Sequence, residues 1–288
     1  MRVMTLIVLA TFVSLNGWAK NFNGAEAFEF TRQAVALGPR PDGSPAIAKL
    51  RTLIKQQLAM RGCEVISDSF TGQTPEGPIP MENIIAKFPG KSGRAIAVTG
   101  HYDTKRLANF VGANDGGSST GMLLEMAAAL QGRARTDDVY LVFFDGEEAI
   151  RDWSDIDSLY GSRHLAAKWS ADGTNRTLKA LINVDMTGDK NLRVWWDTSS
   201  VASLRSLIWD VGDSLGYSAS FLRQGGGIDD DHIPFINAGV RAVDLIDFDS
   251  QKTFWHTPQD TMDKLSMRSF EIVGAVLMKT IAELEQQK

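Results

Sequence analysis

The feature that most constrains this chain is the repeated alternation of short apolar runs with longer stretches whose apolar residues recur at helical spacing. Such alternation favours an α/β fold in which a mixed, mostly parallel central sheet is covered by helices on both faces. A chain of 288 residues, 43% of them apolar, is long enough to bury one large core. We therefore expect a single domain.

The same patterns predict where the elements lie. Helices are expected at 25–37, 46–60, 119–130, 162–169, 202–215 and 266–285. Strands are expected at 64–70, 83–88, 95–99, 139–144, 178–184, 192–196 and 240–246. The stretch 71–80 is rich in Gly, Pro and Thr, and it predicts a turn region between two strands.

Residues 1–19 differ in composition from the rest of the chain. Arg2 gives a positive start, 4–15 is largely apolar, and small residues around Ala19 suit a cleavage site. The pattern predicts a signal peptide at 1–19, which leaves 20–288 as the mature domain. An uncleaved anchor is the less favoured alternative, because a membrane span needs about 20 apolar residues. We expect an exported protein, periplasmic or secreted, with no stable membrane association after cleavage.

Charge excludes one class of partner. The 35 acidic and 30 basic residues are scattered along the chain and give a formal net charge of -5. No basic patch stands out, so we expect no nucleic-acid partner. We expect the mature protein to be a monomer.

Polar residues suited to chemistry follow the apolar runs. Open α/β sheets bind their ligands at the carboxyl ends of the strands, so residues there attract attention. Histidine and carboxylate ligands without a thiolate suit zinc, and a catalytic zinc usually takes three protein ligands. The candidates in chain order are His101, Asp103, Asp115, Asp145, Glu147, Glu148, Asp185 and His256.

Each candidate has a simpler interpretation when it is taken alone. Asp115 lies in an Asn-Asp-Gly-Gly segment that is also typical of a helix N-cap, the commoner role for a lone aspartate there. Glu147 and Glu148 would be stabilised by a metal, which one would bind while the other moves protons. A solvated acidic turn explains that pair equally well.

Several segments resemble the successive motifs of peptidase family M28. They occur in the family's order and spacing over most of the mature chain, and are His101-Tyr102-Asp103-Thr104, Asn114-Asp115-Gly116-Gly117, Asp145-Gly146-Glu147-Glu148, Asp185 and Trp255-His256-Thr257. Longer stretches are similar to glutaminyl-peptide cyclotransferases in particular, namely 143–149, Asp152-Trp153-Ser154, 157–166, Asp230-Asp231-His232-Ile233-Pro234-Phe235 and 254–257.

The resemblance implies that 20–288 is an M28-like catalytic domain that cyclises the N-terminal glutamine of peptides or proteins to pyroglutamate and releases ammonia. It implies one Zn²⁺ per chain. The implied ligands are Asp115, Glu148 and His256. Glu147 is the implied general base and acid, and Asp230 and Asp185 complete its hydrogen-bond network.

The resemblance also assigns the substrate pocket. Trp153 and Trp255 match its aromatic walls, Ile228 is an apolar contact, and Lys105 lies at the mouth. In two-zinc aminopeptidases of the same family, the positions of His101 and Asp185 bind a second metal, with that of Asp115 bridging. His101 is therefore a candidate second-metal ligand, and residue identity alone does not count the metals.

Three positions depart from the family pattern. Gly100 replaces a disulfide-forming cysteine of the animal enzymes, Asp229 a common glutamine, and Gln251 a frequent aromatic residue. Two alternative functions stay open: a two-zinc aminopeptidase that hydrolyses N-terminal residues, and an inactive binding module on a peptidase fold.

Overall fold

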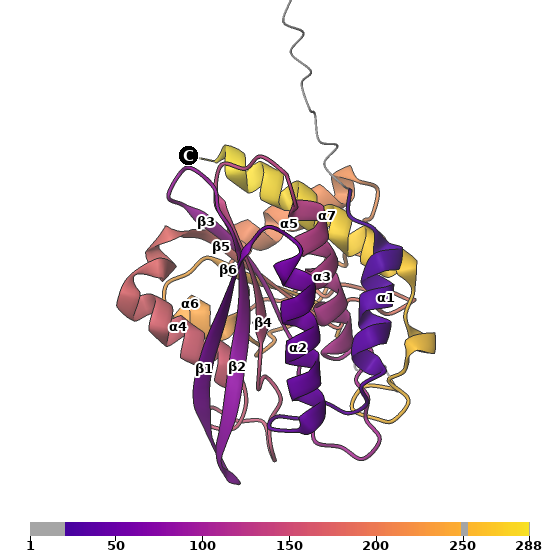
Figure 1. Cartoon of the computed structure of the whole chain (residues 1–288). Coiled ribbons are helices and arrows are strands. Elements are labelled where there is room, and N and C mark those ends of the chain that lie inside the picture. Colours follow the sequence, from indigo (N-terminus) through magenta and orange to yellow (C-terminus); the bar gives the residue numbers. More distant parts are fainter. Residues whose placement is uncertain (1–20, 249–252, 288) are drawn as a thin grey trace, which may run out of the picture.

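The computed structural model describes residues 21–248 and 253–287. The predicted signal peptide at 1–19 and Gln251 lie outside the described residues. Six strands form one sheet in the order β1-β2-β4-β3-β5-β6 (Figure 1). Their bounds are Glu64–Thr74 for β1, Gly77–Phe88 for β2, Ala95–His101 for β3, Asp138–Phe144 for β4, Leu178–Asp185 for β5 and Ala242–Ile246 for β6.

The sheet is mixed, as the alternation of patterns predicted. Strand β3 pairs in parallel with β4 and β5, and β5 pairs in parallel with β6. The β1-β2 and β2-β4 pairs are antiparallel. Because β4, β3, β5 and β6 run the same way, their carboxyl ends meet at one edge of the sheet, where such folds bind ligands.

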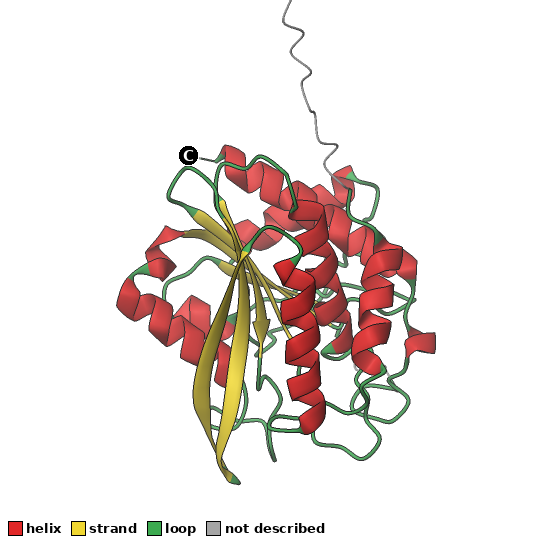
Figure 2. Ribbon diagram, viewed as in Figure 1, coloured by secondary structure: helices red, strands yellow, loops and turns green. Residues whose placement is uncertain are grey.

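Helices cover both faces of the sheet (Figure 2). One face carries α1 (Gly24–Val35), α2 (Pro45–Ala59), α3 (Gly117–Leu130), α5 (Ala202–Ser214) and α7 (Met267–Gln286). The other carries α4 (Tyr160–Asp172) and α6 (Ile233–Asn237). Two short 3₁₀ helices are Thr174–Thr177 and Met262–Lys264. No helix in the described ranges has both the length and the apolar character needed to span a bilayer.

Burial on both faces explains the apolar runs. In β4, Leu141 and Phe143 pack in the core beneath the larger helical layer. Their neighbours Val142 and Phe144 pack in the core beneath α4 and α6. Successive residues of a strand point to opposite faces, so both sets must be apolar, and the strand reads as a continuous run.

The extent predicted for the turn at 71–80 is wrong, because the turn is present but is confined to Pro75 and Glu76. Strands β1 and β2 continue through the rest of this stretch, with Thr71 opposite Pro80 and Thr74 opposite Gly77. The N–H of Glu82 points away from β1 and donates to the Asp145 carboxylate. Every second residue of a strand points the same way, so the N–H that Pro80 lacks would also have pointed away from β1. Strand β4 pairs with β2 only from residue 84 onward. Proline is tolerated on such an unpaired edge.

The prediction of a strand at 192–196 is also wrong. Within it, Val194 forms only an isolated bridge to Phe221. The N–H of Arg193 donates to the Asp247 carboxylate at 3.1 Å instead of to a ladder carbonyl. The segment is apolar because it packs on the core, but it does not join the sheet ladder.

Candidate active site

A cavity of about 480 Å³ opens at the edge of the sheet where the parallel strands end. Nearly every residue that the sequence suggested for the site lines it. These residues are Lys105, Asp115, Glu147, Glu148, Trp153, Asp185, Ile228, Asp230, Trp255 and His256. His101, the last residue of β3, is buried and contacts Asp115 and Asp185.

Three metal-type donors converge in this cavity. The Nε2 atom of His256 lies 3.2 Å from Asp115 Oδ2 and 3.2 Å from Glu148 Oε1. Both oxygens are buried, yet neither has a hydrogen-bond partner among the described residues. The imidazole thus lies at ion-pair distance from both oxygens without a well-aligned hydrogen bond, and the donor atoms of the three side chains lie within 4.8 Å of each other. One imidazole nitrogen and two carboxylate oxygens at this spacing fit a zinc ion.

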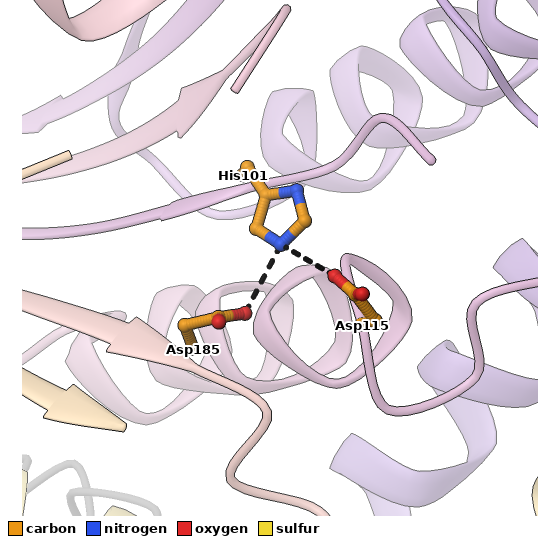
Figure 3. A group of neighbouring side chains, drawn as sticks. All are labelled: His101, Asp115 and Asp185. Atoms are coloured by element: carbon orange, nitrogen blue, oxygen red, sulfur yellow. Dashed lines mark hydrogen bonds and ion pairs between the residues drawn. The ribbon is translucent and has the colours of Figure 1, made fainter. Parts of the chain in front are cut away.

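A second group differs in its hydrogen bonding (Figure 3). His101 Nε2 forms a 3.0 Å hydrogen bond with Asp185 Oδ1 and lies 3.3 Å from Asp115 Oδ1. This group also has its donor atoms within 4.8 Å of one another. Here, however, the imidazole forms a hydrogen bond with the Asp185 carboxylate through Nε2, while its buried Nδ1 has no hydrogen-bond partner among the described residues. Asp115 belongs to both groups, with one oxygen directed to each.

Glu147 lies beside these groups as a buried carboxyl. Its Oε2 is 3.7 Å from His101 Nδ1. Burial raises the pKa of Glu147 well above its usual range, and the charges of Glu148 and Asp230 act in the same direction, against that of His101. Burial likewise raises the pKa of Asp185 to about 7 and raises that of Asp230. A carboxyl whose pKa is raised towards neutral pH is suited to proton transfer.

Backbone contacts fix the loops that carry the acidic residues. Asp103 accepts the N–H groups of Glu147 and Glu148, each at 3.2 Å. Asp260 accepts the N–H of Asp115 at 3.1 Å. Sequence reasoning placed Asp103 near the site without a role. It missed Asp260, because an acid in a loop beyond the last strand carries no local signal of the partner it will meet.

Aromatic side chains form the outer walls of the cavity. Trp153 is 40% exposed, and its Nε1 donates to Asp229 Oδ2 at 2.9 Å. Trp255 is 41% exposed and stacks on the ring of His256, with centroids 4.1 Å apart. Phe248 also lines the cavity and meets Trp255 edge to face. Phe248 was not among the residues predicted from the sequence, because its role depends on this packing.

Lys105 and Ile228 also line the cavity. Lys105 was predicted at the mouth, and its Nζ atom lies 3.4 Å from Glu148 Oε2, which leaves Glu148 Oε1 directed towards His256. The N–H of Ile228 donates to Asp197 Oδ1 at 2.9 Å. That bond fixes the segment that carries Ile228 and Asp229 along the cavity.

Comparison with known protein sequences identifies the family. A model of peptidase family M28 matches residues 83–281. A glutaminyl-peptide cyclotransferase-like protein of Bos taurus is 30% identical over 275 residues, covering 85% of this chain and 72% of its own length. The glutaminyl-peptide cyclotransferase of Drosophila melanogaster is 31% identical over 269 residues, covering 84% of this chain and 76% of its own length. The chain belongs to the glutaminyl-peptide cyclotransferases of family M28.

Solved structures of bacterial glutaminyl cyclases share the fold. The enzyme of an Acidobacteriales bacterium is 40% identical with a TM-score of 0.89, and the match covers 97% of this chain and 100% of that one. The Porphyromonas gingivalis enzyme is 28% identical with a TM-score of 0.84, covering 91% and 98%.

The fold explains one departure from the family's animal members. A Cβ atom at Gly100 would lie 2.7 Å from the carbonyl oxygen of Val184 and 2.8 Å from Ser119 Cβ. The start of α3 and the end of β5 thus approach β3 closely in this chain, and a side chain at this position would require one of them to shift.

Proposed function

We propose that this chain converts the N-terminal glutamine of peptides or proteins to pyroglutamate and releases ammonia, using one zinc held by Asp115, Glu148 and His256. The convergence of these three ligand-type atoms, two of them buried oxygens without hydrogen bonds, in an aromatic-walled pocket carries the proposal. When bound there, zinc supplies a Lewis acid for the γ-amide carbonyl of the substrate.

Proton transfer is assigned to Glu147. In the cyclisation, the α-nitrogen of the substrate forms a bond to its γ-carbon, and the bond from that carbon to the amide nitrogen breaks. Glu147 takes a proton from the attacking amine and returns one to the departing ammonia. Burial raises the pKa of this carboxyl, which lets it hold the proton between the two steps. No external nucleophile takes part.

The buried neighbours orient Glu147 and share the proton. His101 lies between the Asp185 carboxylate, at 3.0 Å, and Glu147 Oε2, at 3.7 Å. Asp230 accepts from the Asn183 amide at 3.1 Å, which fixes the direction of its carboxylate. We assign Asp185 and Asp230 to the proton network of Glu147.

The walls bind the glutamine and limit water. Trp153, Trp255 and Ile228 offer apolar surface to a neutral amide side chain. Such a pocket favours the folded substrate, in which amine and γ-carbon are close, and a well-oriented intramolecular attack needs little further help.

The deciding experiment is an ammonia-release assay on a glutamine-initiated dipeptide, followed by mass spectrometry and repeated after chelation and zinc restoration. We expect a product lighter by one ammonia that forms only when zinc is present, with one zinc per chain by elemental analysis. Free glutamine with two metals would establish the aminopeptidase, its second metal at His101 and Asp185. Absence of either product across several peptides would favour the binding module.

We also propose that residues 1–19 are a signal peptide and that the exported protein, residues 20–288, acts as a monomer in the periplasm or outside the cell. The positive start and short apolar run support export. Mass spectrometry of the mature protein from an expressing cell tests the cleavage site, and light scattering tests the oligomeric state. An intact residue 1 in the exported fraction would reject the cleavage.

A further inference from the structure

Two exposed carboxylates flank Trp153 at the mouth of the pocket. Asp152 and Asp229 line the cavity from opposite loops, and both are exposed. The Trp153 indole donates to Asp229 Oδ2 at 2.9 Å, which joins the two loops. In the part of the chain that the structure describes, neither carboxylate forms an ion pair.

The basic residues that line the pocket are already engaged elsewhere. Lys105 Nζ lies 3.4 Å from Glu148 Oε2, inside the cavity. Arg151 Nε lies 3.9 Å from Glu76 Oε1, a carboxylate that is not part of the lining. The negative charges of Asp152 and Asp229 are therefore left facing the mouth.

The aromatic wall also attracts cations, as the two carboxylates do. Trp153 is 40% exposed, and the negative face of an indole attracts ammonium and guanidinium groups. A hydrogen bond from its Nε1 to a carboxylate adds electron density to the ring. Asp152, Asp229 and the Trp153 indole line the same cavity, so all three would attract a cation at its mouth.

The path of the substrate brings a side chain to this place. If the N-terminal glutamine reacts among Glu147, Glu148 and His256, the rest of the peptide leaves through the mouth. We propose that Asp152, Asp229 and the face of Trp153 form a subsite for a lysine or arginine that directly follows the glutamine. This inference rests on the proposed function, whose substrate class it narrows.

The test compares kcat/KM for Gln-Gly, Gln-Lys and Gln-Glu peptides of equal length with blocked C-termini. We expect Gln-Lys to exceed Gln-Glu roughly fivefold at low salt, which is the upper range of one exposed ion pair. The ratio should shrink towards one at high ionic strength.

Asp229→Asn isolates the charge, because its remaining side-chain oxygen can still accept the Trp153 N–H. It should cut the Lys-to-Glu ratio by about half or more, and Asp152→Asn together with Asp229→Asn should bring it close to one. The ratio is the readout, because a change in turnover that follows from a shift of Trp153 affects both peptides alike. Asp155→Asn is the matched control, because Asp155 is exposed on the same loop but does not line the cavity.

The outcomes distinguish a failure of this inference from a failure of the proposed function. If the wild-type chain with zinc does not cyclise Gln-Gly, the proposed function fails. If Gln-Gly is cyclised but Gln-Lys and Gln-Glu react equally well, the subsite alone is overturned. A ratio that falls as far in Asp155→Asn as in Asp229→Asn also overturns it, because the effect is then that of overall charge.

Discussion

Replacement of Asp157 by asparagine is expected to release the loop that positions Trp153. The Asp157 carboxylate binds three consecutive backbone N–H groups at the start of this loop. Its Oδ1 accepts from Ile150 at 2.8 Å, and its Oδ2 accepts from Arg151 at 2.9 Å and from Asp152 at 3.1 Å. Asp157 itself is buried, and together with the Trp153–Asp229 hydrogen bond it holds one wall of the pocket.

The size of the effect follows from what an amide cannot do. The NH₂ group of asparagine accepts no hydrogen bond, but it can donate to the Tyr160 hydroxyl, which lies 2.8 Å from Oδ1. The amide oxygen can then keep the N–H groups of Arg151 and Asp152, while the N–H of Ile150 loses its acceptor. One lost hydrogen bond to a charged group costs about 1.5–3 kcal/mol, and the two that remain weaken because their acceptor is now neutral. The expected total cost is about 3 kcal/mol.

Hydrogen exchange at the amides of residues 150–152 measures this cost directly. A loss of about 3 kcal/mol of local stability should speed their exchange by roughly 100-fold. The catalytic kcat/KM should fall with it, because Trp153 is no longer held over the cavity. Asp155→Asn changes the same charge two residues away and should leave both readings near wild type. Unchanged exchange at these amides in Asp157→Asn would refute the reasoning.

Three further predictions concern the site and its support. His256→Ala should lose zinc affinity by more than about 100-fold, beyond what loss of an outer partner costs, and activity with it; unchanged zinc content by elemental analysis would reject the ligand. Glu147→Gln should keep zinc but lower kcat by about 100- to 10,000-fold in the ammonia assay, and full activity would reject its role. Gly100→Ala should lower the free energy of unfolding by about 1–3 kcal/mol in a denaturant titration, because its Cβ meets Val184 and Ser119. Equal stability would show that α3 shifts to make room for the methyl group.

The sequence predicted the sheet wherever a strand is buried on both faces. Strand β4 was expected at 139–144 and spans Asp138–Phe144, because every inward position on either face is apolar. The turn between β1 and β2 was expected, but its extent was overestimated, because Gly and Pro at 71–80 are tolerated on an edge that β4 does not reach. The segment 192–196 was apolar for packing alone, and Arg193 gives its N–H to a side chain. Periodicity reports burial, and it does not report where a backbone hydrogen bond goes.

The site shows the same limit in a form that bears on the number of metals. Residue types at His101, Asp115 and Asp185 are those of a second zinc site, so residue identity alone did not count the metals, although the resemblance implied one. Geometry separates the groups: His256 leaves two carboxylate oxygens without hydrogen bonds, whereas His101 and Asp185 bind each other at 3.0 Å. A metal at the second group must first break that hydrogen bond, which costs about 1.5–3 kcal/mol, or roughly 10- to 100-fold in affinity. We therefore expect the second group to bind zinc more weakly than the first, and metal counting by elemental analysis tests the one-zinc proposal.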